Sequence, residues 1–344
     1  MASELVLVEQ RGGEEGADSA HWILEGGSIL PGVDDNRRMA ELRSGLLRHP
    51  RVRAVAADAG DEEVERTLGV LHEPGYLEAL AAAPEEPVVL EEMTPPGLLP
   101  DIPVTAGLVR AAREGVRTAI AAARRLAEGA RFTYALCRPP GHHAGPAWCA
   151  GYCYLNTAAA AAQTLRAAGA GPVAVLDLDF HYPNGTAAVM ESMEDVSLFS
   201  IQAHPVTNVA GGEIDIATDR EVAHEYHVIP DRGMYLETVS DLLREMKGDF
   251  GPTAAIVLSL GYDIVAGDPH GSWDFGPEIF ADLGRILAAS ELPICVVQEG
   301  GYALDLLAEC AEEFAAGLLD DTPQLALQVP ARDPHRQRGN GRIL

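Results

Sequence analysis

Short apolar runs alternate with longer amphipathic stretches along most of the chain. The short runs predict buried strands, because they are apolar and rich in β-branched side chains. They cover residues 4–8, 132–136, 173–176, 196–201, 253–260 and 292–297. The longer stretches predict helices over residues 37–49, 105–128, 156–169, 231–247 and 277–289, with a short helix from 185 and a last helix from 304. Strands that alternate with helices in this way predict an α/β fold, with a parallel sheet covered on both faces.

Two segments lack such a pattern and therefore predict loops. Residues 9–36 are rich in glycine and acidic residues, and residues 84–100 are rich in proline. Thr105 follows the second loop and is placed to cap the long helix after it. There is no internal repeat and no linker, so we expect residues 1–321 to form a single domain. The tail, residues 322–344, contains Pro, Arg and Asn-Gly, and we expect it to be partly flexible.

Composition and charge narrow the class of protein. The chain has 344 residues, of which 47% are hydrophobic, which is enough for a sizeable core. The formal net charge of −27 argues against nucleic acid as a direct partner. No apolar run approaches the roughly 20 residues that span a membrane, and the N-terminus lacks the basic start of a secretion signal. We therefore expect a cytoplasmic protein with no membrane contact, whose five cysteines are buried thiols.

Carboxylates and an imidazole appear where the strand over residues 173–176 should end. Asp177, Asp179 and His181 are spaced two apart, so they point the same way if the strand continues. Two carboxylates and an imidazole on one face can hold a divalent metal. This end of a parallel strand is also where ligands bind in open α/β sheets. An Asp-rich turn that caps the next helix would explain the segment equally well.

Polar turns follow two further strands. Arg-Pro-Pro-Gly-His-His-Ala-Gly occupies residues 138–145, after one strand, and Gly-Tyr-Asp-Ile-Val-Ala-Gly-Asp-Pro occupies residues 261–269, after another. The carboxyl ends of parallel strands share one edge of a sheet, so the ionisable residues of the three turns would converge. This convergence favours a metal site, with a base and a pocket beside it, over the capping turn.

Together with Gln-Glu-Gly-Gly-Tyr at residues 298–302, these segments resemble the zinc-dependent histone deacetylase and acetylpolyamine amidohydrolase family. The motifs Arg-Pro-Pro-Gly-His-His-Ala and Glu-Gly-Gly-Tyr are most similar to its bacterial, class II-like branch. The resemblance runs from about Asp101 to Gly317. It implies the arginase–deacetylase fold, a three-layer α/β/α arrangement with a central, mostly parallel sheet of about eight strands.

The resemblance implies a metal centre with three protein ligands, Asp179, His181 and Asp268. Three ligands leave coordination open for water and for a substrate carbonyl, as in catalytic zinc sites. We expect one Zn²⁺ per chain, although the O, N, O donor set also suits Fe²⁺. The family also holds a structural K⁺ ion. Asp177 could bind it here, together with main-chain carbonyls of Asp179, His181 and Ser200.

The resemblance also assigns catalytic roles. In the family, the counterparts of His142 and His143 act on the water that the metal activates, with Asp177 as the partner of His142 and Asn184 as the partner of His143. A carboxylate raises the basicity of one imidazole, whereas a neutral amide perturbs the other less. We therefore expect His143 to be the general base and later the acid, with exchanged roles left open. The counterpart of Tyr302 donates a hydrogen bond to the carbonyl and then to the tetrahedral oxyanion.

Four positions are expected to contact the substrate. By resemblance, Asp101 lies at the rim of the pocket and accepts hydrogen bonds from the substrate. Tyr152, after Gly151, stands where the family usually has a phenylalanine that lines a narrow tunnel. Phe275 follows the ligand Asp268 by seven residues, where relatives place residues that select the substrate.

The chain departs from the family in one motif. The usual Asp-x-His-His-Gly-Asn-Gly reads Asp-Phe-His-Tyr-Pro-Asn-Gly over residues 179–185. The replaced histidine is not a metal ligand in the family, so the centre should survive. Pro183 fixes the backbone φ angle, so we expect the floor of the pocket to be reshaped.

The implied activity is hydrolysis of an N-acyl amide, most simply an acetyl amide, of a primary amine. The substrate would be an acetyl-lysine peptide or a small cationic acetylpolyamine. An acidic surface could attract such a cation, although general solubility or adaptation to salt also explains the charge, and we favour the solubility explanation. Two alternatives stay open: a deacylase of a biosynthetic small-molecule N-acyl intermediate, and a non-catalytic acyl-amine sensor. A two-manganese ureohydrolase of the arginase branch is disfavoured by Pro183, which stands where that branch usually has another metal ligand. A homodimer is an open alternative to a monomer.

Overall fold

A single parallel sheet forms the centre of the protein. The computed structural model describes residues 3–12, 19–23, 29–204, 221–248 and 255–321. Within these residues eight strands lie in the order β4-β1-β5-β10-β9-β6-β7-β8, and every neighbouring pair is parallel. Their bounds are Leu5–Glu9 (β1), Val52–Ala56 (β4), Phe132–Leu136 (β5), Val173–Asp177 (β6), Val196–Ala203 (β7), Glu221–Tyr226 (β8), Ala255–Leu260 (β9) and Ile294–Gln298 (β10).

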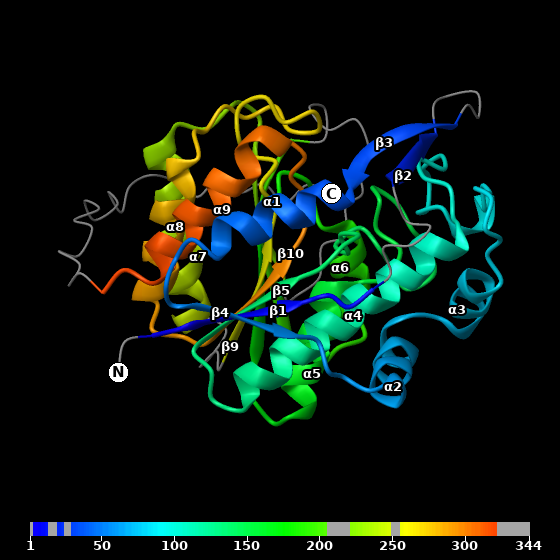
Figure 1. Cartoon of the computed structure of the whole chain (residues 1–344), viewed down its shortest axis with the longest axis horizontal. Helices are drawn as coiled ribbons and strands as arrows, with labels where there is room; N and C mark the ends of the chain where they lie inside the picture. The colour runs from blue at the N-terminus through cyan, green and yellow to red at the C-terminus, as the bar shows by residue number, and fades with distance from the viewer. Residues whose placement is uncertain (1–2, 13–18, 24–28, 205–220, 249–254, 322–344) are drawn as a thin grey trace.

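Helices cover both faces of this sheet (Figure 1). One face carries α1 (Asn36–Leu46), α7 (Arg232–Gly248), α8 (Glu278–Ala289) and α9 (Leu304–Leu318). The other carries α2 (Asp61–Leu71), α3 (Pro74–Ala81), α4 (Ala106–Ala127), α5 (Thr157–Ala167) and α6 (Asn184–Met190).

Each face of the sheet has its own hydrophobic core. Along β1, Val6 and Val8 pack with residues of α4 and α5, whereas Leu5 and Leu7 pack with residues of α1 and α9. This division follows from the alternation of side chains along a strand. The three-layer α/β/α fold expected from the sequence is therefore confirmed.

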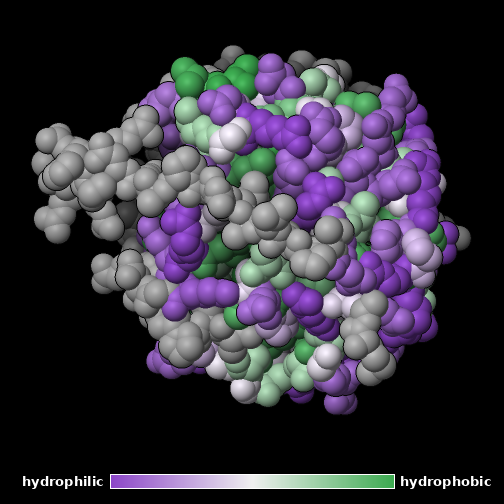
Figure 2. Space-filling view, turned by 90° about the vertical axis from the view of Figure 1, so that its left-hand side faces the viewer, coloured by the Kyte–Doolittle hydropathy of each residue, from purple (hydrophilic) through white to green (hydrophobic). Residues whose placement is uncertain are grey.

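The surface and the helix lengths agree with a globular domain. Hydrophilic residues cover most of the coloured part of the face shown in Figure 2, and hydrophobic residues appear between them in small groups. Among the helices of the described segments, none has the length and apolar content needed to cross a bilayer.

Most predicted elements are present, and their caps agree with the sequence. The Leu108 amide donates to Thr105 Oγ1 over 3.1 Å at the start of α4, and the Ala159 amide donates to Asn156 Oδ1 over 2.8 Å at the start of α5. Residues 84–100 contain a short 3₁₀ turn, η1 (Glu91–Met93), and a single β-bridge from Val88 to Val104, as expected for a loop. The expected flexible tail, residues 322–344, lies outside the described residues.

The prediction of a loop over residues 9–36 is wrong. Antiparallel strands β2 (Ser19–Ile23) and β3 (Ile29–Asp35) form a hairpin in this segment, which projects at the upper right of Figure 1. Their glycine- and acid-rich sequence lacks the apolar alternation that predicts strands. Edge strand β8 was missed for a similar reason, because its Glu-Val-Ala-His-Glu-Tyr sequence is only partly buried. Strand β4 and helix α2 were also not predicted.

The order of the strands brings the sequence motifs together. Strands β5, β10, β9 and β6 are consecutive neighbours in the middle of the sheet. Residues 138–145 follow β5, residues 299–302 follow β10, residues 261–269 follow β9, and residues 178–185 follow β6. Since all four strands are parallel, the four motifs lie at one edge of the sheet.

Candidate active site

The adjacent histidines after β5 lie beside the residues expected to orient them. His142 Nδ1 is 3.4 Å from Asp177 Oδ2, and His143 Nδ1 is 2.6 Å from Asn184 Oδ1. The two imidazole rings are 4.0 Å apart between centroids, and both are buried. Asp177 is the last residue of β6 and Asn184 the first of α6, so one strand-to-helix connection supplies both partners.

The surroundings of the two histidines shift their pKa values in opposite directions. Burial lowers the pKa of His142, but the charges of Asp179 and Asp177 outweigh burial and raise it to about 10. For His143, burial and then the positive charges of His142 and His181 hold the pKa well below its usual value. The pair therefore combines a protonated imidazole with a neutral one at pH 7.

A second cluster lies next to the histidine pair. His181 Nδ1 is 3.0 Å from Asp179 Oδ1 and 3.1 Å from Asp263 Oδ2, and its ring is 5.8 Å from that of His143. One ligand atom from each of His181, Asp179 and Asp263 lies within 4.8 Å of the other two. Burial and the charge of Asp179 raise the pKa of Asp263 to about 7. Buried carboxylates this close repel one another, and a divalent cation between them would relieve the repulsion.

Glycines make room for this cluster. The amide of Gly300 donates to Asp179 Oδ2 over 2.9 Å. A Cβ atom at Gly300 would lie 2.7 Å from that oxygen, and one at Gly261 would lie 2.4 Å from it. Both strand ends therefore need glycine, because any side chain would collide with the Asp179 carboxylate.

Asp268, the third predicted ligand, is buried and held by main-chain amides. Its Oδ2 accepts from Tyr302 at 2.6 Å and Ala303 at 3.1 Å, and its Oδ1 accepts from His270 at 2.9 Å and Gly271 at 3.2 Å. Asp268 is not in the 4.8 Å group, in which Asp263 stands instead. The ligand set of Asp179, His181 and Asp268 stays a prediction. The sequence analysis did not identify Asp263, although it lies in the same motif.

Arg38 positions the segment that ends at Tyr302. Its guanidinium donates to the carbonyl oxygens of Gly301 and Glu299, each over 2.6 Å, and lies 4.5 Å from the centroid of the Tyr302 ring. Arg38 is buried and paired with Asp34. Burial raises the pKa of Tyr302 well above its usual value, so its hydroxyl stays protonated. The sequence analysis assigned no role to Arg38.

Glu299 connects the same segment to the histidine turn. Its Oε2 accepts from the amides of Gly141 and His142, over 2.7 and 3.1 Å. The side chain is buried, and burial raises the pKa of this carboxyl to about 7. Glu299 thus fixes the backbone of the turn that carries His142 and His143.

Three of the four predicted substrate residues lie together. Asp101 Oδ2 accepts from the amide of Gly151 over 2.8 Å. Gly151 has φ +54°, and a Cβ atom there would lie 2.3 Å from His143 Cδ2. Tyr152 follows with φ +67°, and its ring is 5.7 Å from that of Tyr302. The strained turn at Gly151 and Tyr152 thus packs directly on the candidate base.

His270 is a neighbour of these rings that the sequence analysis did not identify. Its Nε2 lies 3.2 Å from the Tyr152 hydroxyl, and its ring is 5.1 Å from that of Tyr302. The only available signal was its position two residues after Asp268.

Phe275, the fourth predicted substrate residue, has core neighbours. It is buried, and its ring lies 5.2 Å from Tyr235 and 5.9 Å from Trp273. Its role in selecting the substrate stays a prediction.

The unusual Tyr182-Pro183 pair leaves Asn184 in place. The Tyr182 hydroxyl donates to Glu221 Oε1 over 2.8 Å, so this side chain points to β8. Pro183, with φ −79°, precedes α6, whose Thr186 amide donates to the carbonyl of His142 over 3.0 Å. The altered motif therefore still places the side-chain amide of Asn184 against His143.

Hydroxyls surround Asp177 where the potassium site was expected. In the sheet register Asp177 pairs with Ser200 on β7 and with Ser259 on β9. Both serine hydroxyls are buried and have no hydrogen-bond partner among the described residues. Buried oxygen atoms without a hydrogen-bond partner are suitable ligands for a hard cation such as K⁺.

Comparisons with known proteins agree with these motifs. The histone deacetylase domain matches residues 34–318. An acetylpolyamine amidohydrolase of Burkholderia pseudomallei (strain 1710b) is 40% identical over 216 residues, which are 60% of this chain and 62% of the relative. Acetylpolyamine amidohydrolase 1 of Pseudomonas aeruginosa is 33% identical over 214 residues, 60% of this chain and 61% of the relative. The chain thus spans 62% or less of the length of these two relatives.

A solved structure extends the likeness to nearly the whole chain. The crystal structure of acetylpolyamine aminohydrolase from Burkholderia pseudomallei matches with a TM-score of 0.77 and 30% identity, over 92% of this chain and 98% of that chain. Its fold is the one formed here by the eight parallel strands and the helices on both faces. The chain therefore belongs to the histone deacetylase family and has the arginase–deacetylase fold.

Proposed function

We propose that the protein is a metal-dependent deacetylase that hydrolyses the N-acetyl amide of a primary amine. The observation that carries this proposal is the pairing of a neutral His143 with a charged His142 beside the cluster of Asp179 and His181. Amide hydrolysis needs a base for water and an acid for the leaving amine, and these groups meet that need. Two relatives are named acetylpolyamine amidohydrolases, which supports an N-acetylated amine as the substrate class.

His143 would act as the base through its Nε2 atom. The side-chain oxygen of Asn184 only accepts hydrogen bonds, so His143 Nδ1 carries the ring proton and Nε2 is left with a free lone pair. Nε2 would take a proton from the attacking water and later return it to the leaving amine. His142, which faces Asp177 and Asp179 through its two nitrogens, would stay protonated and favour negative charge at the reacting centre.

Tyr302 would donate a hydrogen bond to the oxygen of the acetyl carbonyl. The pKa of Tyr302 is raised, so the hydroxyl keeps its proton. The Arg38 guanidinium packs over the ring and holds it in place. The bond would strengthen as negative charge develops on that oxygen, which is the condition for catalysis.

Asp179 and His181 would hold the metal, with Asp268 as the third ligand and Asp263 as the neighbouring carboxylate. When bound, Zn²⁺ or Fe²⁺ supplies a Lewis acid for the carbonyl and lowers the pKa of water. A K⁺ ion beside Asp177 and Ser200 would be structural.

The substrate would be a small cationic acetylpolyamine or an acetyl-lysine peptide. Asp101 and Tyr152 would line the substrate pocket. Asp101 accepts from the amide of Gly151, which precedes Tyr152 in the turn that packs on His143. A carboxylate at that position suits an amine or a peptide N–H.

The test is product release from N-acetylputrescine, acetylspermidine and an acetyl-lysine peptide, offered side by side to protein reconstituted with Zn²⁺ or Fe²⁺. We expect turnover of at least one substrate, and its loss in the His143→Ala variant. Metal binding without turnover of any acetyl amide would contradict the proposal and favour an acyl-amine sensor.

A further inference from the structure

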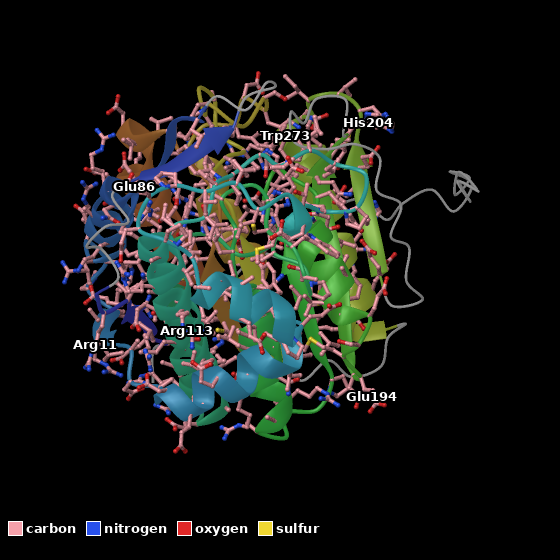
Figure 3. All side chains as sticks on the ribbon, turned by 90° about the vertical axis from the view of Figure 1, so that its right-hand side faces the viewer. Arg11, Glu86, Arg113, Glu194, His204 and Trp273 are labelled. Atoms are coloured by element: carbon pink, nitrogen blue, oxygen red, sulfur yellow. The ribbon has the colours of Figure 1, made fainter. Side chains whose placement is uncertain are left out.

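Three potential metal ligands lie together at the ends of edge strand β8 and its neighbour β7. His204 follows β7, Glu225 lies near the end of β8, and His227 follows β8. One ligand atom from each lies within 4.8 Å of the other two. Figure 3 shows His204 near the top of the view, at the outer side of the sheet. None of the three takes part in the function proposed above.

The sheet register places the three side chains on one face. Gln202 pairs with Glu225 and Ala203 with Tyr226, so the next residue, His204, stands beside His227. The amide of His204 continues the ladder by donating to the carbonyl of Tyr226 over 2.9 Å. Paired residues of neighbouring strands share a face, and so do residues two apart on one strand. The backbone therefore determines this arrangement, although the side chains are near the surface.

The distances suit a metal better than a direct hydrogen bond. His204 Nε2 is 3.4 Å from Glu225 Oε1, and His227 Nε2 is 3.3 Å from the same oxygen. Hydrogen bonds between nitrogen and a carboxylate centre on about 2.8 Å. Ligands at about 2.1 Å from a tetrahedral zinc ion are separated by about 3.4 Å. The two rings lie 4.1 Å apart with an angle of 32° between them, so both Nε2 atoms approach the carboxylate side by side.

The electrostatics also favour a cation. The side chains of His204, Glu225 and His227 are 21%, 34% and 69% exposed, so an ion can reach them and keep water in its open positions. Two imidazole nitrogens and one carboxylate oxygen are donors that suit Zn²⁺. The chain also carries a net charge of −27, which attracts cations.

We propose that His204, Glu225 and His227 form a second, surface Zn²⁺ site that joins the ends of β7 and β8. Two imidazole nitrogens and one carboxylate oxygen would be its protein ligands. The ion would fasten edge strand β8 to the sheet. The site is distinct from the candidate active site, because it shares no residue with the group of Asp179, His181 and Asp263.

The test is the Zn²⁺ content of the full-length protein after chelator treatment and equilibrium dialysis against Zn²⁺. We expect two ions per wild-type chain, one at each site, and one fewer in His227→Ala and in Glu225→Gln. His224→Ala is the matched control, because this neighbouring histidine of β8 faces the other side of the sheet. It should bind as much zinc as the wild type. Equal zinc content in wild type, His227→Ala and Glu225→Gln would overturn the proposal.

A second measurement separates this site from the candidate active site. His227→Ala should keep wild-type deacetylation while it loses one ion, whereas Asp179→Asn should lose deacetylation and keep the ion at β8. Added Zn²⁺ should raise the melting temperature of Asp179→Asn, and should not raise that of the Asp179→Asn/His227→Ala double variant. An equal rise in both would overturn the surface site, and unchanged activity in Asp179→Asn would instead contradict the proposed function.

Discussion

The Nδ1 atom of His143 lies 2.6 Å from the side-chain oxygen of Asn184. This contact fixes the position of the ring proton without adding a negative charge. His142, by contrast, faces a carboxylate. The difference between an amide and an acid is therefore what separates the two histidines chemically.

Replacing Asn184 with aspartate should make His143 more basic. A carboxylate this close raises an imidazole pKa by about 1–3 units. In the proposed mechanism His143 acts in its neutral form, so the acidic limb of the kcat/KM profile should move to higher pH by at least about one unit. Measuring kcat/KM against pH checks this. An unmoved limb would show that His143 is not the base.

Tyr302→Phe should remove the hydrogen bond to the developing oxyanion. The ring that packs against Arg38 remains, so stability should change little. We expect kcat to fall by about 10²–10³-fold, as for the loss of one oxyanion donor. Tyr182→Phe is the matched control, because it removes a hydroxyl that contacts Glu221 instead. A similar loss in both variants would argue against a specific role for Tyr302.

Removing the metal should abolish activity, and Zn²⁺ should restore it. Asp179→Asn should not recover, because it lacks a carboxylate of the cluster. We expect Asp268→Asn to lose the metal as well, since its carboxylate is held rigidly by four main-chain amides. Asp263→Asn should only weaken binding, by about 10–100-fold. If Asp268→Asn kept the metal and Asp263→Asn lost it completely, Asp263 would be the ligand and Asp268 the neighbouring carboxylate.

Glu299→Leu should destabilise the protein, whereas Glu299→Gln should not. The leucine variant leaves the buried amides of Gly141 and His142 without their acceptor, at a cost of about 1–3 kcal/mol for each. Glutamine keeps an oxygen that can accept from both. Unfolding in denaturant at pH 7 measures the difference. Equal stability of the two variants would contradict this account.

Stability should fall in acid because of His72. Burial lowers its pKa to about 4, while its Nδ1 donates to the carbonyl of Gly145 and its Nε2 accepts from the amide of Asn156. The unfolded chain therefore binds a proton below pH 6.5 that the folded chain resists down to about pH 4. This contribution is complete above pH 6.5 and is lost as the pH falls, by up to about 3 kcal/mol.

The His72→Gln variant isolates this effect. Its unfolding free energy should lack the part of the acid dependence that His72 contributes. The difference in unfolding free energy between wild type and variant should therefore become smaller as the pH falls from 6.5 to 4. A constant gap would show that His72 is protonated in the folded state.

The sequence predicted the central strands and the histidine turn well, because buried parallel strands are short apolar runs and the motifs follow them directly. Strand β8 and the β2–β3 hairpin were missed, since edge and hairpin strands do not need a continuous apolar sequence. The role of Arg38 could not be predicted for a different reason. Arg38 contacts Gly301, 263 residues away along the chain, and no local pattern reveals such a pairing.

Glu299 touches two parts of the molecule at once. Its carboxylate holds the turn of His142, and its own carbonyl oxygen is held by Arg38. A substitution at Arg38, Glu299 or His142 would thus alter the surroundings of the other two. We expect their mutational effects to be non-additive, with a double variant of Arg38 and Glu299 losing less than the sum of the single losses. The candidate active site would then respond to substitution at these positions as one coupled unit.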